Sequence, residues 1–417
     1  MVDDLYKKLR SREVLHRSWA AVKQCGLSSP SDATIRAINR YDENWISNLE
    51  QISKRLRMGT FRFDGEHGIT IPKGKGKGLR PLVMAPVDNR IVRRAILEVL
   101  QGYGSDNLGS RKRWPGVSAV TRIMETRTSV GGIKARGVPH GLTLIDEAVR
   151  SGKSWFIRSD IKNFFTRIPL TEVNAFIARA VADPQFEQIF RTALITNLAN
   201  KAELEERNHV KLFPDNDVGV AQGSALSALA ANIALRDFDK CMNGRGIVCI
   251  RYIDDFIMLG PTRANVQAAY ASARKQLALM GMDVYDHTDT AARGDGKFDE
   301  GNIHDGTDVL GYRVSGHSRQ PSSAAMKAFS KKCDNLVGQA KKDMRLAASG
   351  QPSHGLCYHQ AMVLLHKTIR GWSQAFRHTT ALKFSSPSTK TFIAGSTSYG
   401  SLLTPSRRGQ LMKCAGE

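Results

Sequence analysis

Two acidic residues stand where one apolar run gives way to another. Residues 246–253 (GIVCIRYI) and residues 256–259 (FIML) are rich in β-branched and aromatic side chains, so both predict strands. Asp254 and Asp255 separate them, and so short a separation indicates a tight hairpin with both carboxylates at its tip. Taken alone, such a turn is better explained by the local hydrogen bonds that favour Asp in turns.

A second predicted strand ends in the same way. Residues 154–161 (SWFIRSDI) form a mostly apolar run that closes on Asp160. If the two strands are neighbours, three carboxylates meet, and their repulsion raises their pKa values unless divalent cations occupy the cluster. Two Mg²⁺ ions, with Mn²⁺ as a substitute, suit such oxygen ligands and can activate a hydroxyl for attack on a phosphate. The pattern predicts nucleotidyl transfer, with three catalytic metal ligands: Asp160, Asp254 and Asp255.

Three motifs in this region resemble those of reverse transcriptases. YIDDF at residues 252–256 resembles polymerase motif C of that family, and SDIKNFF at residues 159–165 resembles motif A. AQGSALSALAAN at residues 221–232 lies between them and resembles motif B, with Ala228 where the family pattern usually has proline. The resemblance implies RNA-directed DNA synthesis from dNTPs.

A Lys/Gly-rich segment lies upstream of these motifs. Residues 71–82 (IPKGKGKGLRPL), followed by residues 88–94 (DNRIVRR), are similar to the fingers of group II intron and related bacterial enzymes. Lys73 and Arg80 would then hold the triphosphate of the incoming nucleotide. Glycines let a backbone close over phosphates, and Lys and Arg offset their charge. Without the other motifs, a flexible basic loop would be the preferred interpretation.

Further residue roles are implied by the resemblance alone. Phe165 occupies the position where the family places a bulky side chain beneath the incoming sugar, where it would clash with a 2′-hydroxyl. Phe164 is expected in the core, because adjacent residues point in opposite directions. The other implied positions are Ile161 as a metal ligand, Gln222 and Gly223 at the nucleotide, and Tyr252, Leu310, Gly311 and Tyr312 at the primer and template.

Two more segments fit the same family with less specific motifs, and one lysine outside them is a candidate for catalysis. Residues 129–142 are similar to the fingers segment before motif A, which implies template contact, and residues 368–372 (TIRGW) are similar to the thumb helix of group II intron enzymes. Lys297 is the one lysine between Met282 and Val309. It is a candidate to protonate the departing pyrophosphate, with an ordinary loop lysine as the alternative.

The elements that must position these residues form an α+β, right-hand polymerase with an antiparallel palm sheet and helical N- and C-terminal regions. Apolar spacings of three and four predict a basic amphipathic helix over residues 324–346, and a second helix is expected over residues 359–376. The expected domains are a helical N-terminal extension (1–60), fingers (61–150), palm (151–320), a helical thumb (321–384) and a tail without an assigned role (385–417).

The composition suits a polyanionic partner. Lys and Arg total 61 against 39 Asp and Glu, a net charge of +22 in 417 residues. The six cysteines include no CxxC pair, which favours free thiols in a reducing cytoplasm over zinc or disulfides. We see no signal peptide or membrane-spanning run, and lipid binding has net charge alone in its favour.

Within the family, elimination favours a bacterial defence-associated enzyme. No HNH-like cluster of His and Cys follows the expected thumb, and the NAxxH and VTG signatures of retron enzymes are missing. The expected partners are a noncoding RNA template, the cDNA product and dNTPs, with no membrane. A template-independent DNA polymerase and an RNA-binding, maturase-like scaffold remain alternatives. The template, the primer, the fate of the product and the oligomeric state, including a homo-oligomer, stay open.

Overall fold

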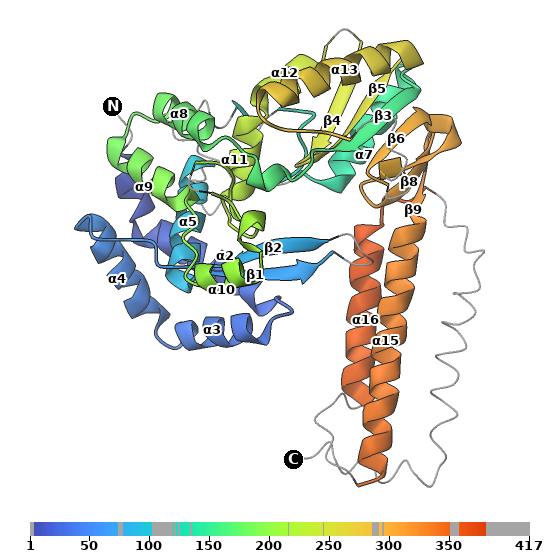
Figure 1. Ribbon diagram of the computed structural model, residues 1–417. Helices are drawn as coiled ribbons and strands as arrows, with labels where there is room; N and C mark the ends of the chain where they lie inside the picture. Colours follow the sequence, from blue (N-terminus) through green and yellow to red (C-terminus); the bar gives the residue numbers. More distant parts are fainter. Residues whose placement is uncertain are drawn as a thin grey trace. The chain divides into compact units, whose positions relative to one another are not determined.

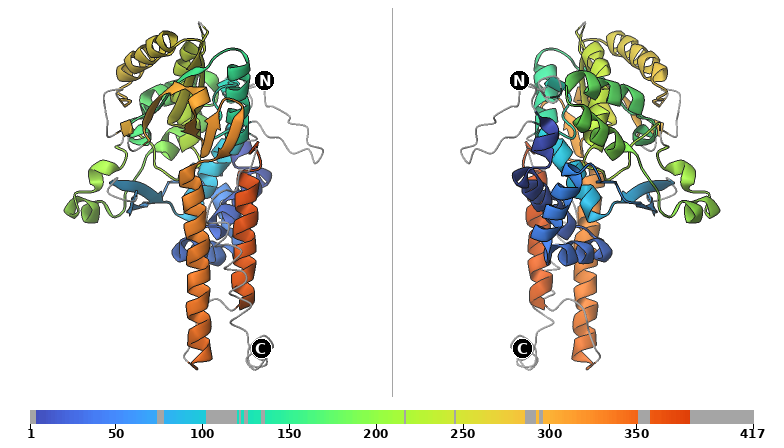
Figure 2. Two further views of the ribbon diagram at one scale, coloured as in Figure 1. Left: turned by 90° about the vertical axis from the view of Figure 1, so that its right-hand side faces the viewer. Right: turned by 90° about the vertical axis from the view of Figure 1, so that its left-hand side faces the viewer.

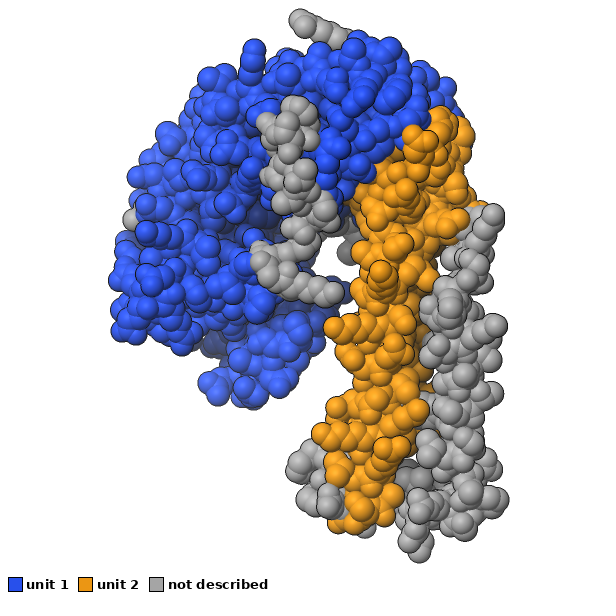
Figure 3. Space-filling model, turned by 45° about the vertical axis from the view of Figure 1, so that its right-hand side comes forward, with its two compact units in different colours: residues 1–302 blue, residues 303–417 orange. Residues whose placement is uncertain are grey.

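The structure is a computed structural model that describes residues 4–73, 78–101, 120, 122–123, 126–133, 136–215, 217–244, 246–285, 292–293, 296–350 and 358–380. The chain forms two compact units, Met1–Asn302 and Ile303–Glu417, which Figure 3 colours separately. This division falls inside the range expected for the palm, and the finer domain boundaries stay predictions. The tail expected at 385–417 lies outside the described residues.

A four-stranded antiparallel sheet lies in the first unit (Figure 1). Its strands follow the order β4-β5-β3-β6, with the bounds Val248–Tyr252, Asp255–Gly260, Trp155–Asp160 and Phe298–Asn302. Strands β3, β4 and β5 come from the predicted apolar runs. Strand β6 (FDEGN) is poor in residues that favour strands and gains its conformation by pairing with β3. The predicted α+β class with an antiparallel palm sheet is confirmed.

Helices cover both faces of this sheet. Helix α13 (Arg263–Leu279) contacts β3 and β5, and helix α7 (Val138–Arg150) contacts β4 and β5. Successive strand residues point to opposite faces, so Phe256 and Met258 enter the main core while Ile257 points the other way. All three are buried. The strands are therefore apolar along most of their length because the sheet is covered on both sides.

The described N-terminal residues are helical. The helices are α1 (Leu5–Leu9), α2 (Arg12–Leu27), α3 (Asp32–Asp42) and α4 (Trp45–Arg57), and α2 packs against α5 (Val87–Leu100). Serine side chains cap two of them. The Ser11 hydroxyl accepts from the Val14 amide at 3.3 Å, and the Ser31 hydroxyl accepts from the Thr34 amide at 3.3 Å. Such caps satisfy amides that have no partner within the helix.

A two-stranded hairpin carries the Lys/Gly-rich segment. Its strands are β1 (His67–Pro72) and β2 (Leu79–Met84). The segment that contains α10 (Lys201–Glu206) and η3 (Val210–Leu212) packs against this hairpin. The Asn200 side chain accepts from the Gly68 amide at 2.8 Å and donates to the Gly68 carbonyl at 2.9 Å. A Cβ at Gly68 would lie 2.8 Å from Leu204 Cδ1, so a larger residue there would require the Leu204 side chain to shift.

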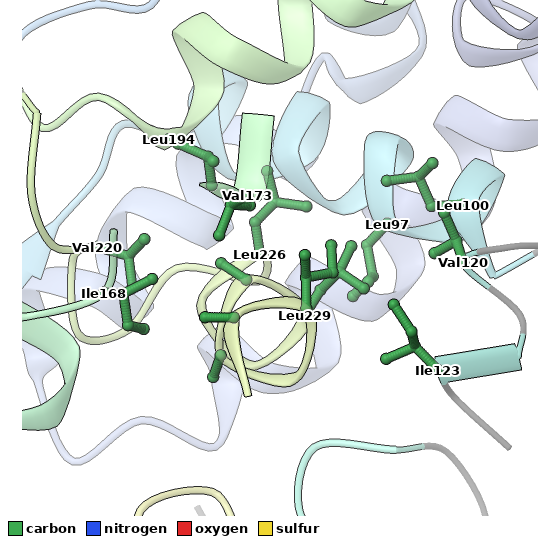
Figure 4. Close-up of a cluster of buried hydrophobic side chains, with 14 of the residues drawn as sticks. Leu97, Leu100, Val120, Ile123, Ile168, Val173, Leu194, Val220, Leu226 and Leu229 are labelled. Carbon is green, nitrogen blue, oxygen red and sulfur yellow. The ribbon is translucent and has the colours of Figure 1, made fainter. Parts of the chain in front are cut away.

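A continuous apolar core lies between the N-terminal helices and the helices that follow β3. Those helices are η2 (Phe164–Thr166), α8 (Leu170–Ala180), α9 (Pro184–Leu194), α11 (Ser227–Ala234) and α12 (Arg236–Met242). In Figure 4, Leu97, Val173, Leu194 and Leu229 converge from α5, α8, α9 and α11, and all are buried. This packing fixes the start of α11, directly after the predicted nucleotide-binding Gln222 and Gly223.

The second unit begins with η4 (Ile303–Asp305) and an antiparallel sheet of β7 (Thr307–Val309), β8 (Tyr312–Ser315) and β9 (Ser318–Pro321). Helices α15 (Ser323–Ala348) and α16 (Tyr358–Ala375) follow and lie side by side in Figures 1 and 2. They match the two helices predicted over 324–346 and 359–376. Along the described part of the chain, no helix combines the length and apolar character needed to cross a bilayer.

Candidate functional site

The β4-β5 hairpin sets the position of two of the three aspartates. Tyr252 pairs with Asp255 at the end of the ladder, so Ile253 and Asp254 form the turn. The sequence predicted Asp254 and Asp255 as the two turn residues. In the structure the turn lies one residue earlier, at Ile253 and Asp254. Ile253 has a φ of 63°, as the first residue of a two-residue hairpin turn requires, although this conformation is unfavourable for a β-branched side chain.

Strand β3 brings the third aspartate to the same place. In the antiparallel pairing of β3 with β5, Asp160 lies directly opposite Asp255. The Ile161 amide donates to the Asp254 carbonyl at 2.9 Å, which ties the end of β3 to the turn. The predicted adjacency of the two strands is confirmed. The catalytic and metal-binding roles of these residues stay predictions.

Burial dominates the electrostatics of the two hairpin aspartates. It raises the pKa of Asp255 to about 6, with Arg158 opposing the rise and Asp254 adding to it. Burial also raises the pKa of Asp254, against the opposing charges of Arg80 and Arg251. Among the described side chains, the buried Oδ1 atom of Asp255 is one that has no hydrogen-bond partner. A buried carboxylate oxygen without a partner is costly, and a cation would relieve that cost.

Asp160 is engaged by a lysine. Its Oδ2 atom forms an ion pair with Lys297 Nζ, and the lysine side chain is 43% exposed. Over the described ranges, no three His, Cys, Asp or Glu side chains lie close enough together to hold a metal ion as they stand. The donor set still fits a hard divalent cation, which prefers carboxylate oxygens. Asp255 offers an oxygen without a partner, and the long, partly exposed lysine can leave Asp160 by side-chain rotation.

The predicted phosphate-binding residues lie on the β1-β2 hairpin. Lys73 follows β1, and its amide donates to the Gly78 carbonyl at 2.9 Å. Arg80 lies on β2, and both side chains are exposed. Arg80 is near enough to Asp254 to oppose the rise in the pKa of that residue. Residues 74–77, which complete the Lys/Gly loop, lie outside the described residues.

The other predicted nucleotide contacts are linked to this hairpin by the backbone. The Val83 amide of β2 donates to the Gln222 carbonyl at 3.3 Å, and Gly223 has a φ of 106°. The Phe165 carbonyl in η2 accepts from the Val220 amide at 2.8 Å. Phe164 is buried in the core as predicted, whereas the Phe165 ring is only partly buried. The structure thus groups the segments that carry Arg80, Gln222 and Phe165.

The predicted primer and template residues fall in both units. Tyr252, beside the aspartate turn, is 37% exposed. In the second unit, Leu310 and Gly311 form the β7-β8 turn, with φ of 53° and 82°. Tyr312 is buried, and its hydroxyl donates to the Ala375 carbonyl at 2.7 Å, so its side chain joins β8 to α16. Direct contact of this turn with a primer stays a prediction.

Two buried arginines lie beside the aspartates, and the sequence did not identify them as residues of the site. Arg251 is fully buried on β4, and Arg158 is 8% exposed on β3. Arg251 donates to the Asp239 carboxylate, with an Nε to Oδ1 distance of 2.7 Å. A signal was present, because each arginine interrupts an apolar strand, and a charge on a buried strand requires a buried partner.

Residues 129–133 lie behind the hairpin. The Val130 amide donates to the Arg251 carbonyl at 2.9 Å, and Ser129 and Val130 are buried. A Cβ at Gly131 would lie 2.5 Å from the Ile253 nitrogen. The resemblance implied template contact for residues 129–142. This template contact stays a prediction, and within residues 129–133 all but Gly132 are buried.

Comparison with known proteins places this site within a recognised family. The family described as "Reverse transcriptase (RNA-dependent DNA polymerase)" matches residues 71–295. The "Uncharacterized 91 kDa protein in cob intron" of Schizosaccharomyces pombe is 26% identical over 197 residues, covering 47% of this chain and 21% of that protein. The "Putative COX1/OXI3 intron 2 protein" of Saccharomyces cerevisiae is 24% identical over 203 residues, covering 48% and 20%. Escherichia coli "Protein YkfC" is 26% identical over 202 residues, covering 47% and 46%.

The matched region therefore spans about a fifth of the two yeast proteins and less than half of the bacterial one. Among solved structures, a partial Cas6-RT-Cas1–Cas2 complex is similar with 22% identity and a TM-score of 0.36, over 66% of this chain and 41% of that chain. Apo telomerase from Candida tropicalis is similar with 12% identity and a TM-score of 0.42, over 90% and 73%.

Proposed function

The chain belongs to the reverse transcriptase family, and on this premise we propose that it is an RNA-directed DNA polymerase. One observation carries the proposal. Within the residues that match the family, Asp160 lies opposite Asp255 in adjacent strands, and Asp254 occupies the turn beside them. This arrangement brings three aspartates to one end of the sheet, which supports a site for two-metal nucleotidyl transfer.

In this proposal, Asp160, Asp254, Asp255 and the Ile161 carbonyl hold two divalent cations, with Mg²⁺ preferred. When bound, the cations supply activation of the primer 3′-hydroxyl and neutralise charge on the departing pyrophosphate. Lys297, which pairs with Asp160 in the structure, is proposed to give a proton to that leaving group.

The nucleotide would lie between the β1-β2 hairpin and the end of β3. Lys73 and Arg80 are exposed cations suited to its triphosphate. Phe165 would exclude a 2′-hydroxyl, and Gln222 and Gly223 would pack against the base pair being formed. Tyr252, the turn formed by Leu310 and Gly311, and Tyr312 after that turn are proposed for the primer and template.

We further propose that the template is a noncoding RNA and that the cDNA serves bacterial defence against phage. The similarity of the Lys/Gly-rich segment to the fingers of group II intron and related bacterial enzymes supports the bacterial origin in this proposal. Sequencing the RNA and DNA that co-purify with the protein, compared with the Asp254→Asn variant, tests this. Recovery of the same noncoding RNA with both, and of its cDNA with the wild type alone, is expected. DNA unrelated to any bound RNA would instead indicate template-independent synthesis.

Primer extension on an RNA template tests the polymerase activity itself. Asp254→Asn keeps the shape of the side chain but removes its charge, and a loss of more than about 100-fold is expected from the weakened metal site. Asp237→Asn is a matched control, because that side chain is 68% exposed on α12. EDTA should stop extension, and added Mg²⁺ should restore it. Extension by Asp254→Asn at the wild-type rate would refute the catalytic role of Asp254. Biological activity that stays intact in this variant although extension is lost would instead favour the RNA-binding scaffold.

A further inference from the structure

The backbone of the aspartate turn adopts an unfavourable conformation. Ile253 has a φ of 63°, in the left-handed region that glycine, asparagine and aspartate tolerate and β-branched residues avoid. Such a conformation persists only where the surroundings hold it in place, and it is often found at functional sites. The neighbours of Ile253 therefore show what maintains the turn.

Arg251 connects this turn to two helices. Its Nη1 atom donates to the Ile253 carbonyl at 2.8 Å. On its other side, Nε and Nη2 donate to the two carboxylate oxygens of Asp239 at 2.7 and 2.5 Å. Nη2 also reaches Asn232 Oδ1 and Ser129 Oγ, each at 3.0 Å. Arg251 is fully buried and Asp239 is 3% exposed, so this network is shielded from water and ions.

The network fixes the peptide group that carries Asp254. The Ile253 carbonyl accepts from Arg251, and the next carbonyl, that of Asp254, accepts from the Ile161 amide at 2.9 Å. Two successive carbonyls of the turn are thus held, one by a side chain from β4 and one by the end of β3. This restricts the direction in which the Asp254 side chain leaves the backbone.

Residues 128–131 support the same turn from behind. The Arg251 amide donates to the Thr128 carbonyl at 2.9 Å, and the Asn232 side chain donates to the Gly131 carbonyl at 3.2 Å. Asn232 therefore joins the arginine to the segment packed against Ile253. The buried side chains of Arg251, Asp239, Asn232 and Ser129 therefore form one hydrogen-bonded network that joins the turn to α11, α12 and residues 128–131.

We propose that Arg251, anchored by Asp239, is a positioning residue. It holds Ile253 at its positive φ and so presents Asp254 to a divalent cation. The inference rests on the proposed function, because it assumes that Asp254 binds metal. The alternative is that Arg251 only stabilises the fold. A second buried pair, Arg93 and Glu66 with 3% and 1% exposure, provides a structural comparison within the same unit.

The first test compares Arg251→Lys with Arg93→Lys, using Mn²⁺ alone as the probe in calorimetric titrations of the full chain. Both variants should lower Tm, because each loses hydrogen bonds from a buried guanidinium. Only Arg251→Lys should weaken Mn²⁺ binding, by about 10-fold or more, as loss of an outer support of a metal ligand does. Wild-type Mn²⁺ affinity in Arg251→Lys, or an equal loss in Arg93→Lys, would overturn the proposal.

A rescue experiment separates positioning from general stability. Glycine adopts positive φ without strain, so Ile253→Gly added to Arg251→Lys should recover Mn²⁺ affinity although Tm stays low. Ile253→Ala, which removes the side chain but keeps the backbone restriction, should not rescue it. Equal behaviour of the two double variants would show that Arg251 does not act through the backbone of residue 253.

If Arg251→Lys does not fold, Ser129→Ala takes its place, because it removes one acceptor of the guanidinium. Its matched control is Ser18→Ala, a fully buried serine whose hydroxyl donates within α2. Weaker Mn²⁺ binding in Ser129→Ala alone is expected, and equal affinities would refute the proposal. A wild-type protein that binds Mn²⁺ but extends no primer would refute the polymerase function and leave this inference standing.

Discussion

The three aspartates occupy different electrostatic surroundings. Asp160 pairs with Lys297, whereas Asp255 is buried near Arg158 and has an oxygen without a hydrogen-bond partner. Asp254 lies in the turn next to Asp255, with a pKa raised by burial. The carboxylate with the least compensation is therefore Asp255. A bound cation would stabilise the protein most through this residue.

Asp255→Asn tests that view by its effect on stability. The folded-state pKa of about 6 lies above the ordinary value of 3.8, so the native state binds this proton more tightly than the unfolded chain. Asp255 therefore costs the metal-free protein stability as pH rises from about 4 to about 6, and the full cost persists at higher pH. Removing the charge should raise Tm at pH 7.5, in EDTA, by about 1–2 °C for each kcal/mol of stability regained.

The same variant should lose the stabilisation that Mg²⁺ gives the wild type. In the wild type, that stabilisation should shrink below about pH 6, because protons compete with the cation for Asp255. Thermal unfolding at pH 5 and 7.5, with Mg²⁺ or EDTA, measures both effects, with Asp237→Asn as the control. A metal-free Asp255→Asn protein less stable than the wild type at pH 7.5 would contradict the argument.

Phe165→Ala tests the proposed exclusion of ribonucleotides. Removing the partly buried ring opens space beneath the sugar, so the ratio of kcat/KM for rNTP over dNTP should rise by about 10-fold or more. Phe164→Leu is the control, because Phe164 is 2% exposed in the core and its loss should affect stability rather than sugar choice. An unchanged ratio in Phe165→Ala would remove this role from Phe165.

At the scale of elements, the sequence predicts those strands and helices whose own residues carry a local hydrophobic pattern. The apolar runs predicted β3, β4 and β5, and periodic spacing predicted α15. Strand β6 was missed because its residues do not favour strands, and its conformation comes from pairing with β3. The turn was misplaced by one residue because the ladder register, rather than the acidic residues, decides where β5 begins.

The partners of Arg251 show a second limit of sequence reasoning. Asp239 and Asn232 lie 12 and 19 positions from it, and Ser129 lies 122 positions away. The apolar strand around Arg251 indicates that a buried partner must exist, but only the folded chain selects it. The convergence of the aspartates was easier to predict than the partners of Arg251, because two strands with the same acidic ending indicate one shared site.

Gly131→Ala tests the packing of residues 129–133 against the hairpin. The added Cβ would lie 2.5 Å from the Ile253 nitrogen and 2.9 Å from its Cγ1 atom, so the hairpin or the segment must move. We expect a loss of about 1–3 kcal/mol in stability and a larger fall in primer extension than stability explains. Gly244→Ala is the control, because nothing lies within 4 Å of its added Cβ. Normal extension by Gly131→Ala would show that the close approach is not needed.

At the scale of the whole molecule, the net charge of +22 predicts a strong electrostatic contribution to RNA binding. Each phosphate that a Lys or Arg neutralises releases counterions, so the logarithm of the affinity should fall linearly with the logarithm of the salt concentration. A flat dependence would contradict a polyanionic partner. The contribution of a particular surface is found from the change in this slope when its cations are removed.

Helix α15 offers such a surface. Lys327, Lys331 and Lys342 are exposed, and their spacings of four and eleven residues are close to whole numbers of turns, so they share one face. Changing all three to Gln should lower the salt slope for an RNA:DNA hybrid by up to about 2–3, because each lost phosphate contact contributes about 0.7–0.9. The fold should be unaffected, since none of these side chains is buried.

The matched control changes three exposed lysines elsewhere, Lys7, Lys211 and Lys240, to Gln. Both triple variants lose the same net charge, so a general weakening of attraction would lower the affinity of each equally. A fall in the slope confined to the α15 variant would identify this helix face as the part of the second unit that contacts the nucleic acid. Equal slopes in the two variants would mean that α15 contributes only to the overall field of the protein, and that the phosphate contacts lie on other surfaces.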